Sequence, residues 1–368
     1  MKILQIIYSL SSGGGERFVV DLCNELVLNV EDDIYLLTIN DDKVVSNMHY
    51  YSSLSSQVEY LNIGAKSGLS LKAIWGVYKK IKEINPDVVH LHCSLILLFL
   101  PVLLLPNVKY FHTLHSIAEK CISFQWLKNV QKVIYRKKVV PITISKYCND
   151  SFRLYYGLDN AICIENGRSA VGVTTKSKIV SDEIQGYVNV IESRMINKKK
   201  CPVFVHVARY AKEKNQTLLF DSFNRLSQKG LAFLLIVIGN NYQNSPYKNF
   251  TSDNIKILGE KTNVGDYLVC SDYFVLSSLY EGLPLSLLEA MSVGCVPIST
   301  PAGGVVDVIE NGMNGYVSPS FGEEDFYNTI LTALTHDNHT LSANAVNTYQ
   351  ERFSMTKCAL SYRRAYLK

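Results

Sequence analysis

The chain has 368 residues, of which 47% are hydrophobic and 19% charged, a balance that excludes a disordered or fibrous protein. This length exceeds the size of most single hydrophobic cores, so two domains are expected. The net charge is only +4, but eleven Lys and Arg residues and only three acids lie between Leu69 and Val140. Such a basic segment would attract an anionic membrane surface or a phosphate-bearing substrate, and solvated helix faces are the alternative.

Nine cysteines are scattered along the chain, without a Cys-x-x-Cys pair or a histidine spacing suited to zinc. They are interpreted as reduced thiols of a cytoplasmic chain. The first residues, MKILQIIY, are too short for a signal peptide and show no small-residue cleavage site, so we expect a buried strand there. The most apolar segment, residues 95–105, is interrupted by Pro101 and falls short of the roughly 20 residues that a membrane-spanning helix needs. We expect a core or interfacial helix at this place.

The first half of the chain alternates β-branched runs with segments of helical period, which predicts parallel strands joined by helical crossovers. The strand candidates are KILQIIY, DIYLLTI, VEYLNI, DVVHLHC, VKYFHTL, VVPITIS and AICIEN. The helix candidates are residues 16–28, 71–84, 125–136 and 146–155. Residues 1–168 are therefore predicted to form one doubly wound α/β domain.

A polar stretch rich in Ser, Thr and Lys follows Asn166-Gly167 and includes Lys198–Lys200, so we place a linker region at residues 169–200. The alternation then restarts, which predicts a second doubly wound domain at residues 201–350 and a ligand site in the cleft between the carboxyl ends of the two sheets. A final helix is expected in residues 351–368, packing back on the first domain. The strand candidates of the second half are PVFVHVA, FLLIVIG, IKILG, DYFVLS, VPIST and GYVS, and the helix candidates are residues 215–228, 264–270, 284–293 and 325–335.

The segment YSLSSGGGERFVV follows the first strand and opens the first helix, where backbone N–H groups and the helix dipole favour an anion. A dinucleotide fingerprint is one alternative, but its third glycine would stand at position 18, which is Phe18. No acidic residue clearly ends the second strand either. The other alternative for Gly13, Gly14 and Gly15 is a flexible turn without a ligand.

Cations and histidines also follow predicted strands. The segment HVARYAKEKNQTLLF places Arg209 and Lys214 after the strand that opens the second domain, where two cations would suit a diphosphate. Ordinary surface charge is the alternative. His115, in YFHTLHS, lies where the first domain is expected to face the cleft. His90 and His92 are predicted to alternate between the faces of a strand and are interpreted as structural.

The segment SLYEGLPLSLLEAMSVG contains two acids, Glu281 before a Gly-Leu-Pro turn and Glu289 on the following helix, with Pro284 at an early helical position. Glu289 has apolar neighbours, so it needs hydrogen-bond donors from a ligand or from a structural partner. The carboxylates of a retaining glycosidase stand about 5 to 5.5 Å apart. Five residues of helix and a turn would separate these two by on the order of 10 Å or more. We interpret them as two contacts along one long ligand.

These segments together resemble a known family. The second half carries HVARYAKEKNQ, DYFVLSSLYEG, EGLPLSLLEAMSVGCVPIST and GGVVDVIENGMNGYV, and the first half carries GGGERFVVDL, PDVVHLHCS, TLHS and ISKYCND. Over essentially the whole chain they resemble a retaining glycosyltransferase of family 4 (glycosyl transferases group 1), with Glu281 and Glu289 in the acidic positions of the family's E-x7-E block. The resemblance implies the GT-B fold, α/β with two Rossmann-like domains, the first for the acceptor and the second for a nucleotide-sugar donor.

The resemblance also implies roles for single residues. Arg209 and Lys214 would hold the diphosphate, and Glu289 would accept hydrogen bonds from the ribose hydroxyls. His115 and Glu281 would be catalytic contacts to the transferred sugar, Glu281 as a positioning group. The nucleotide diphosphate sugar would be a substrate, with neither a metal nor another cofactor required. The remaining donor-binding residues would be Gly13, Gly14, Gly15, Gly282, Leu283, Pro284 and Leu285.

The expected function is transfer of a hexose-type sugar from a UDP-sugar, favoured over a GDP-sugar, to a glycan or lipid-linked glycan in bacterial surface polysaccharide synthesis. We expect a cytoplasmic protein that associates peripherally with an anionic membrane and binds no nucleic acid. The alternatives are a sugar-nucleotide epimerase of the same fold and a non-catalytic nucleotide-sugar-binding module. Two departures from the family concern the donor pocket and the hinge: VIGNNYQN lacks the second glycine of a G-x-G turn, and Arg168-Ser169 follows Asn166-Gly167.

Overall fold

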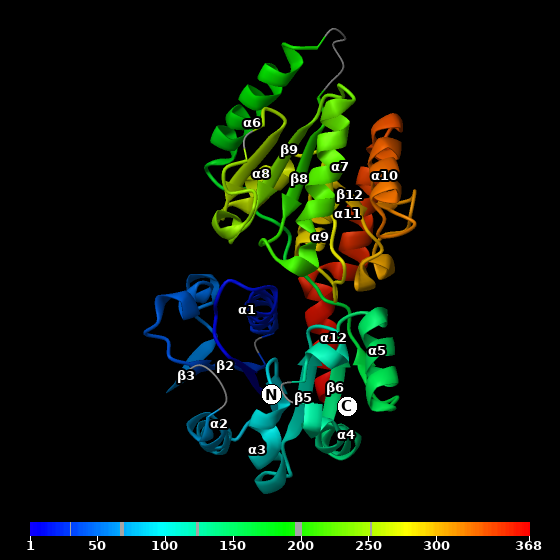
Figure 1. Cartoon of the computed structure of the whole chain (residues 1–368). Helices are drawn as coiled ribbons and strands as arrows, with labels where there is room; N and C mark the ends of the chain where they lie inside the picture. The colour runs from blue at the N-terminus through cyan, green and yellow to red at the C-terminus, as the bar shows by residue number, and fades with distance from the viewer. Residues whose placement is uncertain (30, 67–69, 123–124, 196–200, 251) are drawn as a thin grey trace. The chain divides into compact units, whose positions relative to one another are not determined.

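The computed structural model describes residues 1–29, 31–66, 70–122, 125–195, 201–250 and 252–368. Within these ranges the chain divides into two compact units (Figure 1). Unit 1 consists of Met1–Ser169 and Arg352–Lys368, and unit 2 consists of Ala170–Glu351. Each unit has its own parallel sheet and its own buried core.

Unit 1 is built on a seven-stranded parallel sheet in the order β3-β2-β1-β4-β5-β6-β7. Every strand predicted for the first half of the chain is present. The strands are β1 (Lys2–Ile7), β2 (Asp33–Asn40), β3 (Glu59–Ala65), β4 (Val88–Leu91), β5 (Lys109–Leu114), β6 (Val139–Thr143) and β7 (Ile162–Cys163). The helices are α1 (Gly14–Leu26), α2 (Leu71–Ile84), α3 (Phe99–Leu104), α4 (Lys128–Lys137), α5 (Lys146–Tyr156) and α12 (Met355–Leu367).

The order of the strands in unit 1 reverses between β1 and β4, and ligands of doubly wound sheets bind at such a point, outside the carboxyl ends of the strands. Helix α1 follows β1 and buries Phe18, Leu22 and Leu26, an apolar stripe with helical spacing. Its partner is α12, drawn in red in Figure 1, which packs against it. The last helix of the chain therefore belongs to the core of unit 1.

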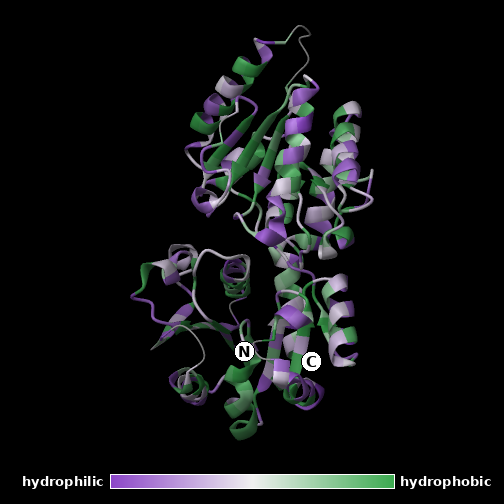
Figure 2. Cartoon of the chain, viewed as in Figure 1, coloured by the Kyte–Doolittle hydropathy of each residue, from purple (hydrophilic) through white to green (hydrophobic). Residues whose placement is uncertain are grey.

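Unit 2 is built on a six-stranded parallel sheet in the order β10-β9-β8-β11-β12-β13, and Figure 2 shows its strands as mainly hydrophobic. Such continuous apolar runs are typical of parallel strands covered on both faces. The strands are β8 (Val203–Val207), β9 (Leu234–Ile238), β10 (Ile255–Gly259), β11 (Tyr273–Leu276), β12 (Val296–Ser299) and β13 (Tyr316–Val317). The helices are α6 (Ser177–Glu192), α7 (Gln216–Gln228), α8 (Val264–Val269), α9 (Leu285–Ser292), α10 (Glu323–Thr335) and α11 (His339–Thr348).

The structure differs from the expected linker at residues 169–200, because this segment contains α6. Val180, Ile184 and Val188 lie one helical turn apart and are buried, and the helix packs against α8 and β9. The linker prediction gave weight to the polar composition and overlooked this spacing. Lys198–Lys200, which was part of the same prediction, lies outside the described residues. Helix α11 was not predicted either.

The apolar segment at residues 95–105 forms a 3-10 turn, Leu95–Leu98, followed by the short helix α3. Its inner side is buried through residues such as Leu97 and Val102, whereas Leu103 and Leu104 are exposed. Among the described residues, none of the helices has the length and apolar character needed to cross a membrane.

Candidate functional site

In unit 2, the predicted cations and one of the predicted acids lie in the two segments that follow the central strands β8 and β11. Strands β8 and β11 are parallel neighbours, so the segments that follow them lie side by side. Lys214 comes from the first segment, and its Nζ donates to Glu281 Oε1 of the second at 2.7 Å. Ser278 Oγ donates to the same carboxylate oxygen at 2.6 Å. The exposed fractions of the Lys214 and Glu281 side chains are 19% and 10%, so this ion pair is largely shielded from water.

The two segments are also joined through the backbone. Leu279 N donates to the carbonyl of Glu213 at 2.8 Å, and Ser277 Oγ donates to the carbonyl of Lys214 at 2.9 Å. A third segment, after β12, takes part because Gly304 N donates to the carbonyl of Glu281 at 3.0 Å. The position of the ion pair therefore depends on main-chain contacts as well as on its own charges, which preorganises the cluster.

Arg209 lies two residues beyond the end of β8 and is 62% exposed. Its Nη2 donates to Glu213 Oε1 at 2.9 Å, while its carbonyl accepts from Gln216 Nε2 at 2.8 Å. Burial acts to raise the pKa of Glu213, but the hydrogen bonds it accepts and the charges of Arg209 and Lys214 together lower the pKa. The carboxylate is thus charged, and an anionic ligand would share Arg209 with it.

Helix α9 begins at Leu285, one residue later than predicted, and Pro284 is its N-cap in an extended conformation. No side chain caps this helix end, so its first turn presents backbone N–H groups to an anion. Glu289 lies one turn after Leu285 and is half-buried, whereas Glu281 is buried at 9% exposure. The apolar residues around Glu289 on the helix are buried, as expected: Leu287, Leu288, Ala290 and Met291.

Gly239, the first glycine of VIGNNYQN, occupies a position that admits no side chain. Its φ is +154°, and a Cβ would lie 2.0 Å from the carbonyl oxygen of Ala208. The next residue, Asn240, accepts a hydrogen bond from Tyr210 N at 2.9 Å. The departure from the G-x-G turn therefore lies directly beside the segment that carries Arg209.

In unit 1, the predicted glycines and His115 lie together. Gly13 is the N-cap of α1 without a side-chain cap, and a Cβ on Gly15 would stand 3.8 Å from the His115 ring. The Glu16 carboxylate folds back over the start of the helix, because a Cβ on Gly13 would lie 2.2 Å from its Oε2. At Gly14, by contrast, a Cβ would have no other heavy atom within 4 Å. This helix start thus brings three glycines together with one acidic side chain and one imidazole.

His115 is hydrogen-bonded to His92, which the sequence analysis interpreted as structural: His115 Nε2 and His92 Nδ1 are 3.0 Å apart. His92 Nε2 in turn lies 2.7 Å from Gln5 Oε1. The prediction that His90 and His92 alternate between strand faces is wrong, because residues two apart share a face, and their ring centroids are 4.0 Å apart. That spacing was the signal that could have identified His92 as a neighbour of the site.

The four histidines at and just after the ends of β4 and β5 are neutral. Burial lowers the pKa of His115 to about 3, with a contribution from the nearby His112. Burial likewise lowers the pKa of His112 to about 4 and that of His90 and His92 well below the ordinary value. His112 is satisfied by the Tyr135 hydroxyl at 2.7 Å and the Cys93 carbonyl at 2.8 Å. These imidazoles therefore act as hydrogen-bonding groups rather than as charges.

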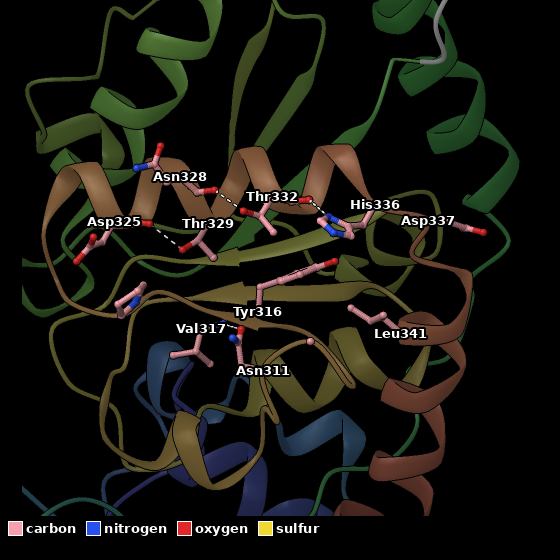
Figure 3. A pocket seen from close by; sticks show the side chains of 12 residues that line it. Asn311, Tyr316, Val317, Asp325, Asn328, Thr329, Thr332, His336, Asp337 and Leu341 are labelled. Carbon is pink, nitrogen blue, oxygen red and sulfur yellow. Dashed lines mark hydrogen bonds between the residues drawn. The ribbon is translucent and has the colours of Figure 1, made fainter.

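Unit 2 also contains a pocket of about 530 Å³ that none of the predicted site residues lines (Figure 3). It lies at the edge strand β13, below α10 and beside the start of α11. Thr329 and Thr332 of its wall donate to backbone carbonyls of their own helix, and Tyr316 donates to Asn338 at 2.8 Å. The polar groups of this pocket are thus largely engaged with one another.

No group of three His, Cys, Asp or Glu side chains that could hold a metal ion occurs in the part of the chain that the structure describes.

The candidate residues form two sets, one in each unit. Unit 2 combines Arg209, Lys214, Glu281 and the start of α9, and Glu289 follows one turn along that helix.

Two family models match the chain. Residues 12–169 match Glycosyltransferase Family 4, and residues 191–350 match Glycosyl transferases group 1. The chain is 25% identical over 309 residues to the UDP-Gal:alpha-D-GlcNAc-diphosphoundecaprenol alpha-1,3-galactosyltransferase of Escherichia coli, covering 78% of this chain and 76% of that protein. It is 27% identical over 322 residues to the capsular polysaccharide biosynthesis glycosyltransferase CapH of Staphylococcus aureus, covering 82% and 81%.

Solved structures show the same architecture. HepE of Anabaena in complex with UDP and glucose superimposes with a TM-score of 0.75 at 18% identity, over 99% of both chains. The sucrose-phosphate synthase of Thermosynechococcus elongatus superimposes with a TM-score of 0.79 at 15% identity, over 100% of this chain and 98% of the other. Together with the two parallel sheets, these likenesses confirm the predicted GT-B fold.

The neutral histidines predict a steep loss of stability in mild acid. In the unfolded chain their pKa values return to about 6.5, so only the unfolded state takes up protons as the pH falls from 6.5 towards 4. Each such histidine lowers the free energy of unfolding by about 1.4 kcal/mol per pH unit in this window. Urea unfolding followed by far-UV circular dichroism at pH 7.5, 6.0 and 5.0 measures the free energy of unfolding at each pH.

The matched variants for this test are His112→Asn and His339→Asn. The first removes one buried histidine, so unfolding should take up about one proton fewer and the free energy of unfolding should change less steeply with pH. The second changes an exposed histidine on α11 and should leave the pH dependence as it is. A free energy of unfolding that stays constant between pH 7.5 and 5.0 would contradict the prediction.

Proposed function

The chain belongs to the family 4 glycosyltransferases, and from this premise we propose that it transfers a hexose-type sugar from a UDP-sugar to a glycan or lipid-linked glycan. The E. coli relative is named for UDP-Gal and a diphosphoundecaprenol-linked acceptor, and CapH for capsular polysaccharide synthesis. HepE was solved with UDP and glucose. These relatives support a UDP-sugar over a GDP-sugar and a role in bacterial surface polysaccharide synthesis.

The observation that carries this proposal is the cluster at the edge shared by β8 and β11. Arg209, Lys214 and the start of α9, which no side chain caps, would offer positive charge to a diphosphate. Glu281 lies within the same cluster and offers carboxylate oxygens to the hydroxyl groups of a sugar. Glu289, one turn into the helix, would accept from the ribose hydroxyls at the other end of the donor.

The chemistry follows from where charge develops. The bond between the anomeric carbon and the diphosphate oxygen breaks, and negative charge grows on the diphosphate, where Arg209, Lys214 and the α9 start stabilise it. The acceptor oxygen forms the new bond on the same face of the sugar, and its proton passes to the departing phosphate oxygen. Configuration is thereby retained. The positive charge comes from the protein, so the proposal requires no metal or other cofactor.

Glu281 acts in this scheme as a positioning group rather than as a nucleophile. Its Oε1 already accepts hydrogen bonds from Lys214 and Ser278, which holds the carboxylate in place and lowers its reactivity. In unit 1, His115 would contact the transferred sugar, and Gly13–Gly15 at the start of α1 would contact the diphosphate. We assign the acceptor to unit 1 and the nucleotide part of the donor to unit 2, as in the family 4 glycosyltransferases.

The proposed location is the cytoplasm, with the protein on the inner face of the membrane. Helices α2 and α3 pack against each other, and both carry exposed apolar side chains: Leu71, Trp75, Leu103 and Leu104, the α2–α3 surface. Lys79 lies over the Trp75 ring at 5.9 Å. An apolar surface with lysines beside it is suited to a bilayer of anionic lipids, where a lipid-linked acceptor would be found.

Incubation of the purified protein with UDP- and GDP-sugars should release the nucleoside diphosphate only when a lipid-linked glycan is added. Release from UDP-sugars should exceed release from GDP-sugars. Interconversion of the free nucleotide sugar without acceptor, seen by NMR, would instead identify an epimerase, and binding without turnover would identify a non-catalytic module. Absence of transfer across a broad panel of donors and acceptors would contradict the proposal.

The two acids should have separable effects in this assay. Glu289→Ala removes the ribose contacts and should raise the Kd for UDP by about 10- to 100-fold, with a smaller effect on kcat. Glu281→Ala should lower kcat on the order of 100-fold and change UDP binding less, because the sugar end of the donor is affected. Glu323→Ala, an exposed acid on α10, is the control. Unchanged turnover in both variants would show that these roles are wrongly assigned.

Membrane binding should depend on the α2–α3 surface. We expect the protein to sediment with vesicles of phosphatidylcholine and phosphatidylglycerol, and less with phosphatidylcholine alone. The double variant Leu103→Gln, Leu104→Gln should weaken binding at least tenfold, because burying one leucine contributes ~1.5 kcal/mol or more. Leu154→Gln changes a leucine that is more exposed than either of these but lies on α5, and this variant should bind as before. Failure of the unmodified protein to bind anionic vesicles at low salt would refute this part.

A further inference from the structure

A continuous line of hydrogen bonds connects His115 with the interior of unit 1. We infer that Gln5 and His92 are positioning residues that hold His115 in the tautomer protonated on Nε2, so that its Nδ1 receives a hydrogen bond from a substrate hydroxyl. The inference rests on the proposed role of His115 at the transferred sugar. It adds the direction of the hydrogen bond and the residues that set that direction.

Gln5, on the central strand β1, sets the direction. Its side chain is fully buried, its Nε2 donates to the Tyr366 hydroxyl at 3.1 Å, and its Oε1 lies 2.7 Å from His92 Nε2. A carbonyl oxygen can only accept a hydrogen bond, so His92 Nε2 must carry a proton. A neutral imidazole has one N–H, and His92 Nδ1 is therefore an acceptor.

The same reasoning applies one step further. His92 Nδ1 lies 3.0 Å from His115 Nε2, and because the first atom accepts, the second must donate. The low pKa of His115, about 3 through burial, keeps this ring neutral, so it carries no second proton. The proton of His115 is therefore on Nε2, and Nδ1 has a free lone pair.

On the other side of Gln5, the hydrogen bonds of the Tyr366 hydroxyl follow from the same amide orientation. The Tyr366 hydroxyl, which accepts from Gln5, lies 2.6 Å from His90 Nδ1 and donates to it. His90 Nε2 then donates to Thr113 Oγ1 at 2.8 Å. A reversed Gln5 amide would require the opposite direction in every one of these bonds. The orientation of the buried Gln5 amide is thus transmitted through His92 to His115.

The free nitrogen of His115 is accessible. Within the described residues Nδ1 has no hydrogen-bond partner, and it is absent from the fully buried polar atoms, so solvent reaches it. The ring is held by edge contact with Phe18, whose centroid is 5.4 Å away, and by the close approach of Gly15. An accessible acceptor on a fixed ring beside the glycine loop is suited to orienting a sugar hydroxyl, and in this state it cannot act as a proton donor.

The tautomer can be measured directly on the full chain labelled with ¹⁵N-histidine. The chain has eight histidines, and His115→Gln assigns the signals of interest. Long-range ¹H–¹⁵N spectra should show His115 protonated on Nε2 and unprotonated on Nδ1 between pH 6 and 8. A proton on Nδ1 would overturn the inference.

The variant His92→Phe keeps an aromatic ring but removes the acceptor, so a population of His115 protonated on Nδ1 should appear. Transfer should fall about tenfold in kcat, the loss of one hydrogen bond, while the Kd for UDP changes less than twofold. His112→Phe is the matched control, because His112 is buried and bonded to Tyr135 and Cys93 but lies outside the line. It should leave the His115 tautomer unchanged.

Gln5→Leu gives a second test if His92→Phe does not fold, and it should also release the Nδ1-protonated form. A pure Nε2 tautomer in both variants would refute the role of Gln5 and His92. The spectra need no substrate, so the two proposals can fail separately. A protein that shows the expected tautomer but transfers no sugar would refute the proposed function and support the positioning of His115.

Discussion

Parallel pairing of the strands is the constraint on which both units depend, because it brings the carboxyl ends of neighbouring strands to one edge. In unit 2, β8 and β11 end together, and Lys214 meets Glu281 across 67 residues of sequence. In unit 1, the segments after β1, β4 and β5 bring the glycine loop, His92 and His115 together. Residues far apart in the chain thus become neighbours through strand order alone.

The candidate residues of the two units differ in charge. The cluster of unit 2 is charged, with Arg209 and Lys214 each paired to an acid, and it suits a ligand whose negative charge increases during the reaction. The histidines in the cluster of unit 1 are neutral, because burial removes their charge and leaves only their hydrogen bonds. Unit 2 would therefore supply charged side chains to the ligand, whereas the histidines of unit 1 would act through hydrogen bonds alone.

Much of the fold could be predicted because buried parallel strands are continuous apolar runs between polar turns, and every predicted strand is present. Lys214 and Glu281 could be expected near each other because they lie in the segments that follow two such runs, β8 and β11. Helix α6 was missed because its buried positions are diluted by polar residues, and His92 because its face was wrongly assigned. Gln5 carries no signal at all, since one amide within an apolar strand has a meaning only when its partners are known.

Those partners come from the other end of the chain. Tyr366, on α12, is 361 residues from Gln5 in the sequence, and its hydroxyl is hydrogen-bonded to both the Gln5 amide and His90. The helix is held there by Arg363, which donates to Asp32 at 2.7 Å, while the amino terminus lies 3.0 Å from the same carboxylate. Burial acts to raise the pKa of Asp32, but the hydrogen bonds and charges of Arg363 and the amino terminus together lower it. The carboxylate therefore stays charged at neutral pH, and the anchor persists. The final helix is therefore a chemical part of unit 1, because a hydroxyl that it supplies belongs to the line of hydrogen bonds that reaches His115.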